Sequence, residues 1–327
     1  MWYAWIVRPS FDIPAVAPAA SEAFAAVRSL ARASSENFPV LSALVPEAAR
    51  DDLSAVYAFC RVADDLADET GSDDAARARS LALLGALREE VAMGWSGHAR
   101  HPVVVALADT AARTGMPESL ATNLIGAFEQ DQRVLRYSTL DELVAYSRGS
   151  ANPVGRMVLH LAMGNGGLRS ITPQMLQMSD AVCTALQLTN FWQDVRRDLL
   201  ERDRVYLPLA EMDLDANEIE RAVRSAGGEK GDGAISEAFA ERYERAMSPL
   251  MARTWAMFER GRGLASLVPP ELSPVIRLFV EGGEATLARV QRAGASVLRE
   301  RPSLGKGSKA WMVGRAWARA MWMRAAS

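Results

Sequence analysis

The sequence predicts an all-α protein, and three observations lead to that prediction. Runs of Val, Ile and Thr that alternate with polar residues between turns are nearly absent. Ala, Leu, Arg, Glu and Met instead recur at helical spacing, and Gly and Pro fall between these segments. The 327 residues are 49% hydrophobic and 24% charged. Those fractions are typical of a globular protein and exclude a disordered chain or a coiled-coil rod.

Breaking residues divide the first half of the chain into helices. Pro39 and Pro46 precede the first helix, and a turn over 71–74 and a loop over 94–102 follow later. Thr139 is a natural N-cap for a further helix. The expected helices run from Pro46 to about 69, from 74 to about 93, and over 103–114, 117–131, 139–149 and 153–163.

A longer helix opens the second half. Thr172 and Pro173 form an N-cap with proline at the first helical position, and the pattern continues to about Leu200. Residues 227–233 are the most glycine-rich stretch, and loop residues 302–307 precede a last helix. Helices are expected over 234–264 and 271–298. Because no linker is poor in apolar residues, we expect one domain over 1–327, with an N-terminal extension over 1–20.

Charge and cysteine content restrict the setting of the protein. The net charge is −3, but 14 basic and 5 acidic residues stand from Arg245 onward. This basic end either meets phosphates or an anionic membrane, or balances the acidic part within one fold. Cys60 and Cys183 are too few for a disulfide framework. With no targeting segment and no uncharged run near 20 residues, we expect a cytoplasmic protein with peripheral membrane contact at most.

The first acidic motif lies on the helix predicted to end near residue 69. Its polar stripe, at three- and four-residue spacing, comprises Tyr57, Arg61, Asp64, Asp65 and Asp68. Carboxylates one turn apart repel each other, and a divalent cation such as Mg²⁺, which takes oxygen ligands, reverses that effect. The alternative interpretation is a solvated acidic helix end.

The second acidic motif lies on the long helix that begins at Pro173. Its polar face comprises Gln187, Asn190, Asp194 and Asp198. The helix starts apolar, so this face is expected to lie deep, where polar groups need partners or ions. Asn190, Asp194 and Asp198 would form an oxygen site of charge −2. The segment after the helix carries donors suited to phosphate, Arg204 and Tyr206.

Two such faces, far apart in sequence, predict a single metal-binding site that they share. If they oppose each other across a helical bundle, they hold Mg²⁺ ions that bind a diphosphate. Breaking a carbon–diphosphate bond needs positive charge at the leaving group, which metals and arginine supply. The rest of the cavity would have to be apolar, to shelter a carbocation from water.

At this point the motifs resemble a known family. Tyr57-Ala-Phe-Cys-Arg61-x-x-Asp64-Asp65-x-x-Asp68 and Asn190-x-x-x-Asp194-x-x-x-Asp198 are similar to the paired aspartate motifs of the squalene/phytoene synthases. Tyr146, before Ala151 and Val154-Gly155, is similar to a third segment of that family. The resemblance covers about 36–300, most clearly to Pro208. It implies the isoprenoid synthase fold, a single large helical bundle around a central apolar cavity.

The resemblance also implies roles for individual residues. About three Mg²⁺ ions would bind with the diphosphate, and the implied ligands are Asp64, Asp65, Asp68, Asn190, Asp194 and Asp198. Substrate contacts are implied for Tyr57, Arg61, Gln187, Arg204 and Tyr206. Tyr146 would act in catalysis with Asp64, Asp68 and Asp194, by stabilising cations or relaying a proton. The competing interpretations are a core tyrosine at 146 and an intrahelical partner at Arg61.

Three segments resemble the family members that form hydroxysqualene in hopanoid biosynthesis. They contain Asn37, Asn152-Pro153 and Gln193. The resemblance implies that presqualene diphosphate is ionised and the cation quenched by water, which Asn152 or Gln193 would hold, and NADPH is not expected. Relatives usually have Arg at 193, so either one diphosphate fewer is bound or another arginine serves. The spacing from Asp198 to Arg204 is one residue longer than usual.

Other functions remain open at this stage. Within the family, the chain could join two prenyl diphosphates such as farnesyl diphosphate, as squalene or phytoene synthases do. The first motif also fits head-to-tail prenyltransferases and terpene cyclases, although a cyclase would normally have Ser and Glu after Asn190. A non-catalytic relative would bind polyprenyl lipids or pathway partner enzymes. No feature of the sequence indicates a nucleic-acid partner, and Gly261-x-Gly263 is no dinucleotide fingerprint.

Overall fold

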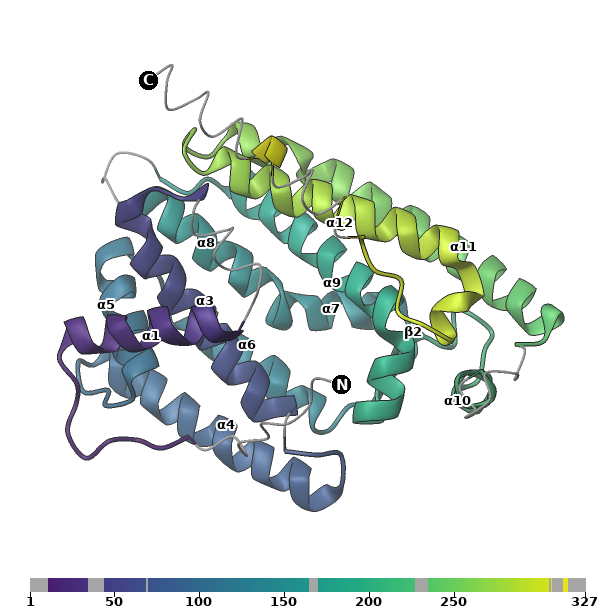
Figure 1. Ribbon diagram of the computed structural model, residues 1–327, viewed down its shortest axis with the longest axis horizontal. Helices are drawn as coiled ribbons and strands as arrows, with labels where there is room; N and C mark the ends of the chain where they lie inside the picture. The colour runs from purple at the N-terminus through teal and green to yellow at the C-terminus, as the bar shows by residue number, and fades with distance from the viewer. Residues whose placement is uncertain are drawn as a thin grey trace. The chain divides into compact units, whose positions relative to one another are not determined.

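The computed structural model confirms the all-α prediction. It describes residues 11–34, 44–68, 70–164, 170–226, 235–305, 307 and 314–316. Eleven α-helices and one short strand pair lie in these ranges (Figure 1). The chain divides into two compact units, one of residues 1–133 and 153–171 and the other of 134–152 and 172–327. The single domain expected over 1–327 stays a prediction.

The first unit is built around a central helix, α3. Its helices are α1 (Ala20–Ser34), α3 (Arg50–Asp68), α4 (Asp74–Trp95), α5 (Pro102–Thr114), α6 (Glu118–Asp131) and α8 (Asn152–Gly164), whose first residue falls in the other unit. Helix α3 packs against α1, α4, α5 and α6 (Figure 1). The core contains Phe59, Leu66, Leu84, Leu107 and Ile125, all at most 2% exposed. Burial of such side chains is the main stabilising contribution.

An ion pair between a buried carboxylate and a partly exposed arginine fixes α5 to α3. Asp52 is 1% exposed. It accepts hydrogen bonds from Thr110 Oγ1 at 3.0 Å and from Arg113 Nη1 at 3.1 Å. The Arg113 guanidinium also lies 5.7 Å from the ring centre of Phe24 on α1. A carboxylate buried so deeply requires partners of this kind.

The second unit is built around α9. Its helices are α7 (Leu140–Ser150), α9 (Pro173–Arg202), α10 (Ala216–Ser225), α11 (Glu237–Gly261) and α12 (Ser273–Ala293), with 3₁₀ turns η2 (Arg262–Ser266) and η3 (Gly294–Leu298). Helices α9, α11 and α12 lie side by side (Figure 1). Trp192 on α9, fully buried, donates its indole N–H to Thr254 Oγ1 on α11 at 3.1 Å. This hydrogen bond satisfies the buried polar atom of the ring.

Two glycines permit the close packing around α9. A Cβ atom on Gly261 would lie 2.3 Å from Val182 Cγ2, and one on Gly283 would lie 2.5 Å from Leu186 Cδ2. Distances below 3.0 Å are forbidden to a side-chain carbon, so neighbouring atoms would have to move. The backbones of α11 and α12 therefore approach α9 most closely at these two glycines, which have no side chain.

Four elements differ from the sequence-based prediction. Helix α1 was missed because its buried stripe is made of small residues, Ala23, Val27 and Ala31. Helix α10 was missed although Asp215 and Glu218 form a capping box at its start. The strands β1 (Arg136–Tyr137) and β2 (Val205–Pro208) pair in parallel and are too short for a periodic signal.

Several predictions concern residues outside the described ranges. These are the Asn37 segment, the 227–233 loop and most of the last helix. Within the described residues, no helix combines the length and the apolar character needed to cross a bilayer.

Candidate functional site

The first acidic motif lies on the last three turns of α3. Its five predicted residues are all partly exposed, whereas Ala63, Leu66 and Ala67 on the opposite face are buried in the core. Two further acidic residues, Asp51 and Asp52, lie in the first turn of α3 and favour the helix through its dipole, but they are not part of the motif. The sequence thus divides this helix into one apolar and one polar face, as predicted.

Arg61 neutralises part of this face. Its Nη1 lies 3.4 Å from Asp64 Oδ2 and its Nη2 lies 2.5 Å from Asp65 Oδ1. The intrahelical partnership considered for Arg61 is therefore present, which leaves a role in substrate binding as a proposal. Burial and the negative charge of Asp64 raise the pKa of the adjacent Cys60 thiol to about 12.

The second acidic motif lies on α9. Gln187 is half-buried and Asn190 is exposed, whereas Asp194 and Asp198 are 9% and 8% exposed. Asp198 Oδ1 lies 3.2 Å from Arg202 Nη1, one turn along the same helix. Asp194 is paired with Arg301, whose Nη2 donates to its Oδ2 at 3.0 Å and whose Nε donates to its Oδ1. Both carboxylates therefore have arginine counter-ions.

Gln193 connects α9 to the segment after η3. It is 6% exposed, its Nε2 donates to the Pro302 carbonyl at 2.5 Å, and its Oε1 accepts from Arg301 Nη2 at 3.0 Å. The sequence left open that another arginine serves as the phosphate-binding cation; the structure shows Arg301 in contact with Gln193, and its part in binding phosphate stays a prediction. No spacing pattern could have identified it, since 108 residues separate it from Gln193.

The chain turns sharply between α9 and β2. Asp203 ends the helix in a left-handed conformation with φ of 53°, and the Arg204 amide donates to the Asp198 carbonyl at 3.0 Å. The residue directly before Arg204 thus forms the helix cap, and the cap sets the path from Asp198 to Arg204. Arg204 is buried, at 6% exposed.

Tyr146 belongs to a cluster of four rings within the second unit. This aromatic cluster comprises Tyr137, Tyr146, Phe191 and Tyr206, each at most 7% exposed. Phe191 and Tyr206 stack with ring centres 4.2 Å apart, and the Tyr146 centre lies 5.9 and 5.7 Å from theirs. Two predicted residues, Tyr146 and Tyr206, are therefore brought together. A third, Asn152, is 5% exposed and accepts from Thr184 Oγ1 at 3.1 Å.

The predicted ligands suit a hard cation. Carboxylate and amide oxygens are what Mg²⁺ takes in proteins, and both faces supply only such atoms. Among the residues that the structure describes, no three His, Cys, Asp or Glu side chains converge closely enough to hold a metal ion. The two faces belong to different units. Their opposition across one cavity therefore stays a prediction.

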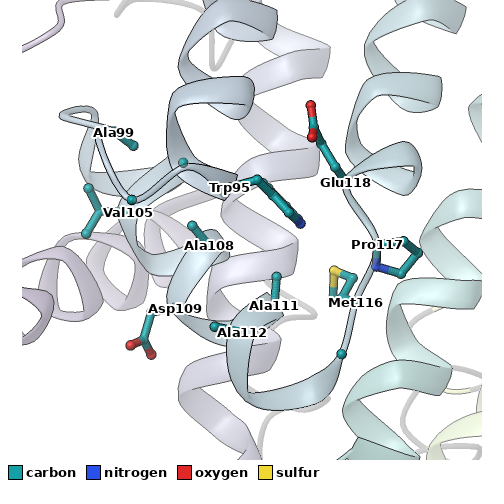
Figure 2. Close-up of a pocket in the computed structure, with 13 residues that line it drawn as sticks. Trp95, Ala99, Val105, Ala108, Asp109, Ala111, Ala112, Met116, Pro117 and Glu118 are labelled. Atoms are coloured by element: carbon teal, nitrogen blue, oxygen red, sulfur yellow. The ribbon is translucent and has the colours of Figure 1, made fainter.

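A separate groove lies on the first unit. It has a volume of about 700 Å³ and is formed where α4 ends and α5 and α6 meet. Small alanine and glycine residues line it together with Trp95 and Met116 (Figure 2). None of the predicted site residues lines this groove, which is thus distinct from both acidic motifs.

Comparison with known proteins relates these features to a family. The model of the squalene/phytoene synthase family matches residues 31–308. The chain is 34% identical to a hydroxysqualene synthase of Rhodopseudomonas palustris over 71% of its own length and 70% of the relative's. It is 28% identical to a phytoene synthase of Rhodobacter capsulatus over 88% and 78%.

A solved structure supports the same relationship. Squalene synthase HpnC from Alicyclobacillus acidocaldarius matches with a TM-score of 0.71 and 36% identity, covering 84% of this chain and 95% of that one. A dehydrosqualene synthase at 19% identity, with a TM-score of 0.72, shares the fold.

Proposed function

We propose, because this chain belongs to the squalene/phytoene synthase family, that it is a Mg²⁺-dependent hydroxysqualene synthase. The observation that carries the proposal is its identity of 32–37% to three hydroxysqualene synthases. Both acidic motifs are complete in this chain. The substrate would be presqualene diphosphate, and the product hydroxysqualene and inorganic diphosphate.

The two acidic faces would hold the metal ions. Asp64, Asp68, Asn190, Asp194 and Asp198 supply the oxygen ligands, with Asp65 beside them. When bound, Mg²⁺ contributes the positive charge that makes diphosphate a leaving group. Arg61 and Arg204 would add charge at the departing oxygens, and Tyr57 and Gln187 would orient the diphosphate or a carboxylate.

The aromatic cluster would face the cation formed after ionisation. The carbon–oxygen bond breaks with its electron pair on diphosphate, and the cyclopropylcarbinyl cation rearranges. The negative faces of Tyr146 and Tyr206 stabilise positive charge without reacting with it. A water oxygen then bonds to carbon and loses a proton, which the Tyr146 hydroxyl is suited to relay. Asn152, with its Oδ1 turned to Thr184, keeps amide hydrogens for that water.

The product identifies the reaction directly. Purified protein is incubated with presqualene diphosphate and Mg²⁺ in ¹⁸O-labelled water, with and without NADPH, and the products are analysed by mass spectrometry. We expect labelled hydroxysqualene in both cases. Squalene that forms only with NADPH would assign the chain to the reductive squalene synthases. No release of diphosphate at all would indicate a polyprenyl-binding protein without activity.

The chemistry of the product favours an enzyme that acts at or near a membrane surface. Hydroxysqualene is a lipid, so transfer to a membrane or to a pathway partner enzyme would follow its release. The excess of basic residues after residue 244 favours peripheral contact of a cytoplasmic protein with anionic lipid. Cosedimentation with anionic but not neutral vesicles is expected, and equal binding to both would contradict it.

A further inference from the structure

The segment after η3 lies directly against the second acidic motif. Arg301 contacts both oxygens of Asp194, through Nη2 at 3.0 Å and through Nε. The Asp194 side chain is 11% exposed and the Arg301 side chain 48% exposed. The guanidinium therefore covers the carboxylate from its solvent side, where an ion from solution would arrive.

Gln193 is chemically suited to hold this contact. One amide both donates, to the Pro302 carbonyl, and accepts, from Arg301 Nη2. An arginine at 193 has no acceptor atom and would repel Arg301, so it could not make the same pair of hydrogen bonds. Because Gln193 and Pro302 are both buried, these bonds fix the backbone directly after Arg301 and the end of its side chain.

The Arg301 contact differs from the other counter-ions. Arg61 and Arg202 come from the same helix as the carboxylates they pair with. Arg301 stands 107 residues from Asp194. The contact therefore attaches the 299–304 segment to α9, and its loss leaves the Gln193–Pro302 hydrogen bond to hold that segment.

We propose that Arg301, positioned by Gln193, is a built-in counter-ion that a divalent metal ion has to displace from Asp194. The inference rests on the proposed function, in which Asp194 is a metal ligand. The Arg301 guanidinium and a metal ion would compete for the two carboxylate oxygens of Asp194, because each is a cation that binds them by direct contact. The counter-ion keeps a buried carboxylate neutralised while no metal is bound, and metal binding is coupled to release of the segment.

Metal binding without substrate tests the competition. Isothermal titration calorimetry with MgCl₂ alone is performed on wild type, Arg301→Gln, Gln193→Met and, as matched control, Arg292→Gln on the exposed side of α12. We expect Arg301→Gln to bind Mg²⁺ about tenfold more tightly, Gln193→Met to change in the same direction, and Arg292→Gln to equal wild type. Equal or weaker binding by Arg301→Gln, in a wild type that does bind Mg²⁺, overturns the inference alone.

A second measurement uses the wild-type protein and needs no variant. Amide hydrogen exchange of residues 299–304 should accelerate several-fold when Mg²⁺ is added, while that of α12 stays constant. Unchanged exchange at saturating Mg²⁺ would contradict release of the segment. Absence of any Mg²⁺ binding by wild type, even with inorganic diphosphate, would instead refute the proposed function.

Discussion

The two acidic motifs carry similar residues and obtain their counter-ions in different ways. On α3 the carboxylates are partly exposed, and Arg61 reaches them from the same helix. On α9 the two aspartates are buried, and Arg301 reaches Asp194 from a distant part of the chain. The first motif is thus a local property of one helix, while the second depends on tertiary structure. Substitution of Asp64 on α3 and of Asp194 on α9 should therefore affect protein stability differently.

The largest expected effect is on turnover, and it should be the same for both motifs. Asp64→Asn and Asp194→Asn each remove a charged metal ligand, so we expect diphosphate release to fall on the order of 10³-fold. Glu201→Gln, at an exposed position of α9, serves as control and should keep near wild-type activity. Wild-type turnover by either aspartate variant would show that its motif takes no part in the reaction.

The packing of α9 offers a matched pair of substitutions on α12. A methyl group on Gly283 would overlap Leu186 and Phe258, whereas nothing lies within 4 Å of the position it would take on Gly282. We expect Gly283→Ala to lower the free energy of unfolding by about 1–3 kcal/mol. Gly282→Ala should raise it by about 0.5–1 kcal/mol, because alanine favours a helix. Urea unfolding measures both, and equal changes would contradict this packing.

The counter-ions predict different effects on stability in metal-free buffer. Asp194→Asn removes the charge of a carboxylate that is 11% exposed and accepts two hydrogen bonds from Arg301, so we expect a loss of about 1–2 kcal/mol in the free energy of unfolding. Asp64→Asn breaks a partly exposed pair and should change it by less than about 0.5 kcal/mol. Sequence alone predicts that without metal both variants keep the fold intact or make it more stable, because each change reduces repulsion between carboxylates. A gain for Asp194→Asn would show that Arg301 contributes nothing.

The smallest effect concerns Cys60, one turn before Asp64. Burial and the charge of Asp64 raise the pKa of its thiol to about 12, above the usual value of a free cysteine. At pH 9, Cys60 of the native protein should therefore react with iodoacetamide much more slowly than Cys60 of the unfolded protein, as peptide mapping would show. Because the folded pKa is raised, stability from this group is present at neutral pH and is lost as pH rises above about 9. Rapid alkylation of native Cys60 would contradict the shift.

The sequence predicted the long helices well, because their caps and breakers are local signals. Thr172 caps α9 and Thr139 caps α7, as expected. The elements that it missed carry weaker signals: α1 buries mostly alanine, and β1 and β2 are too short for any period to show. Their positions depend on contacts between distant residues.

The candidate site divides in the same way. The acidic stripes of α3 and α9 follow from helical spacing alone, and the structure reproduces them. The aromatic cluster joins four elements of the second unit, so only Tyr146 and Tyr206 were recognised beforehand. Arg301 could not be identified, since its contact with Asp194 arises from the tertiary path of the chain after η3.

The central claim is that both acidic faces bind one diphosphate through shared metal ions. Calorimetric titration of inorganic diphosphate in the presence of Mg²⁺ on wild type, Asp64→Asn, Asp194→Asn and the double variant tests it as a double-mutant cycle. If the faces act together, each single substitution should weaken binding at least about tenfold, and the double variant should bind no more weakly than the weaker single variant. A single substitution that removes one bound diphosphate and leaves a second bound with wild-type affinity, as for two independent sites, would contradict the claim.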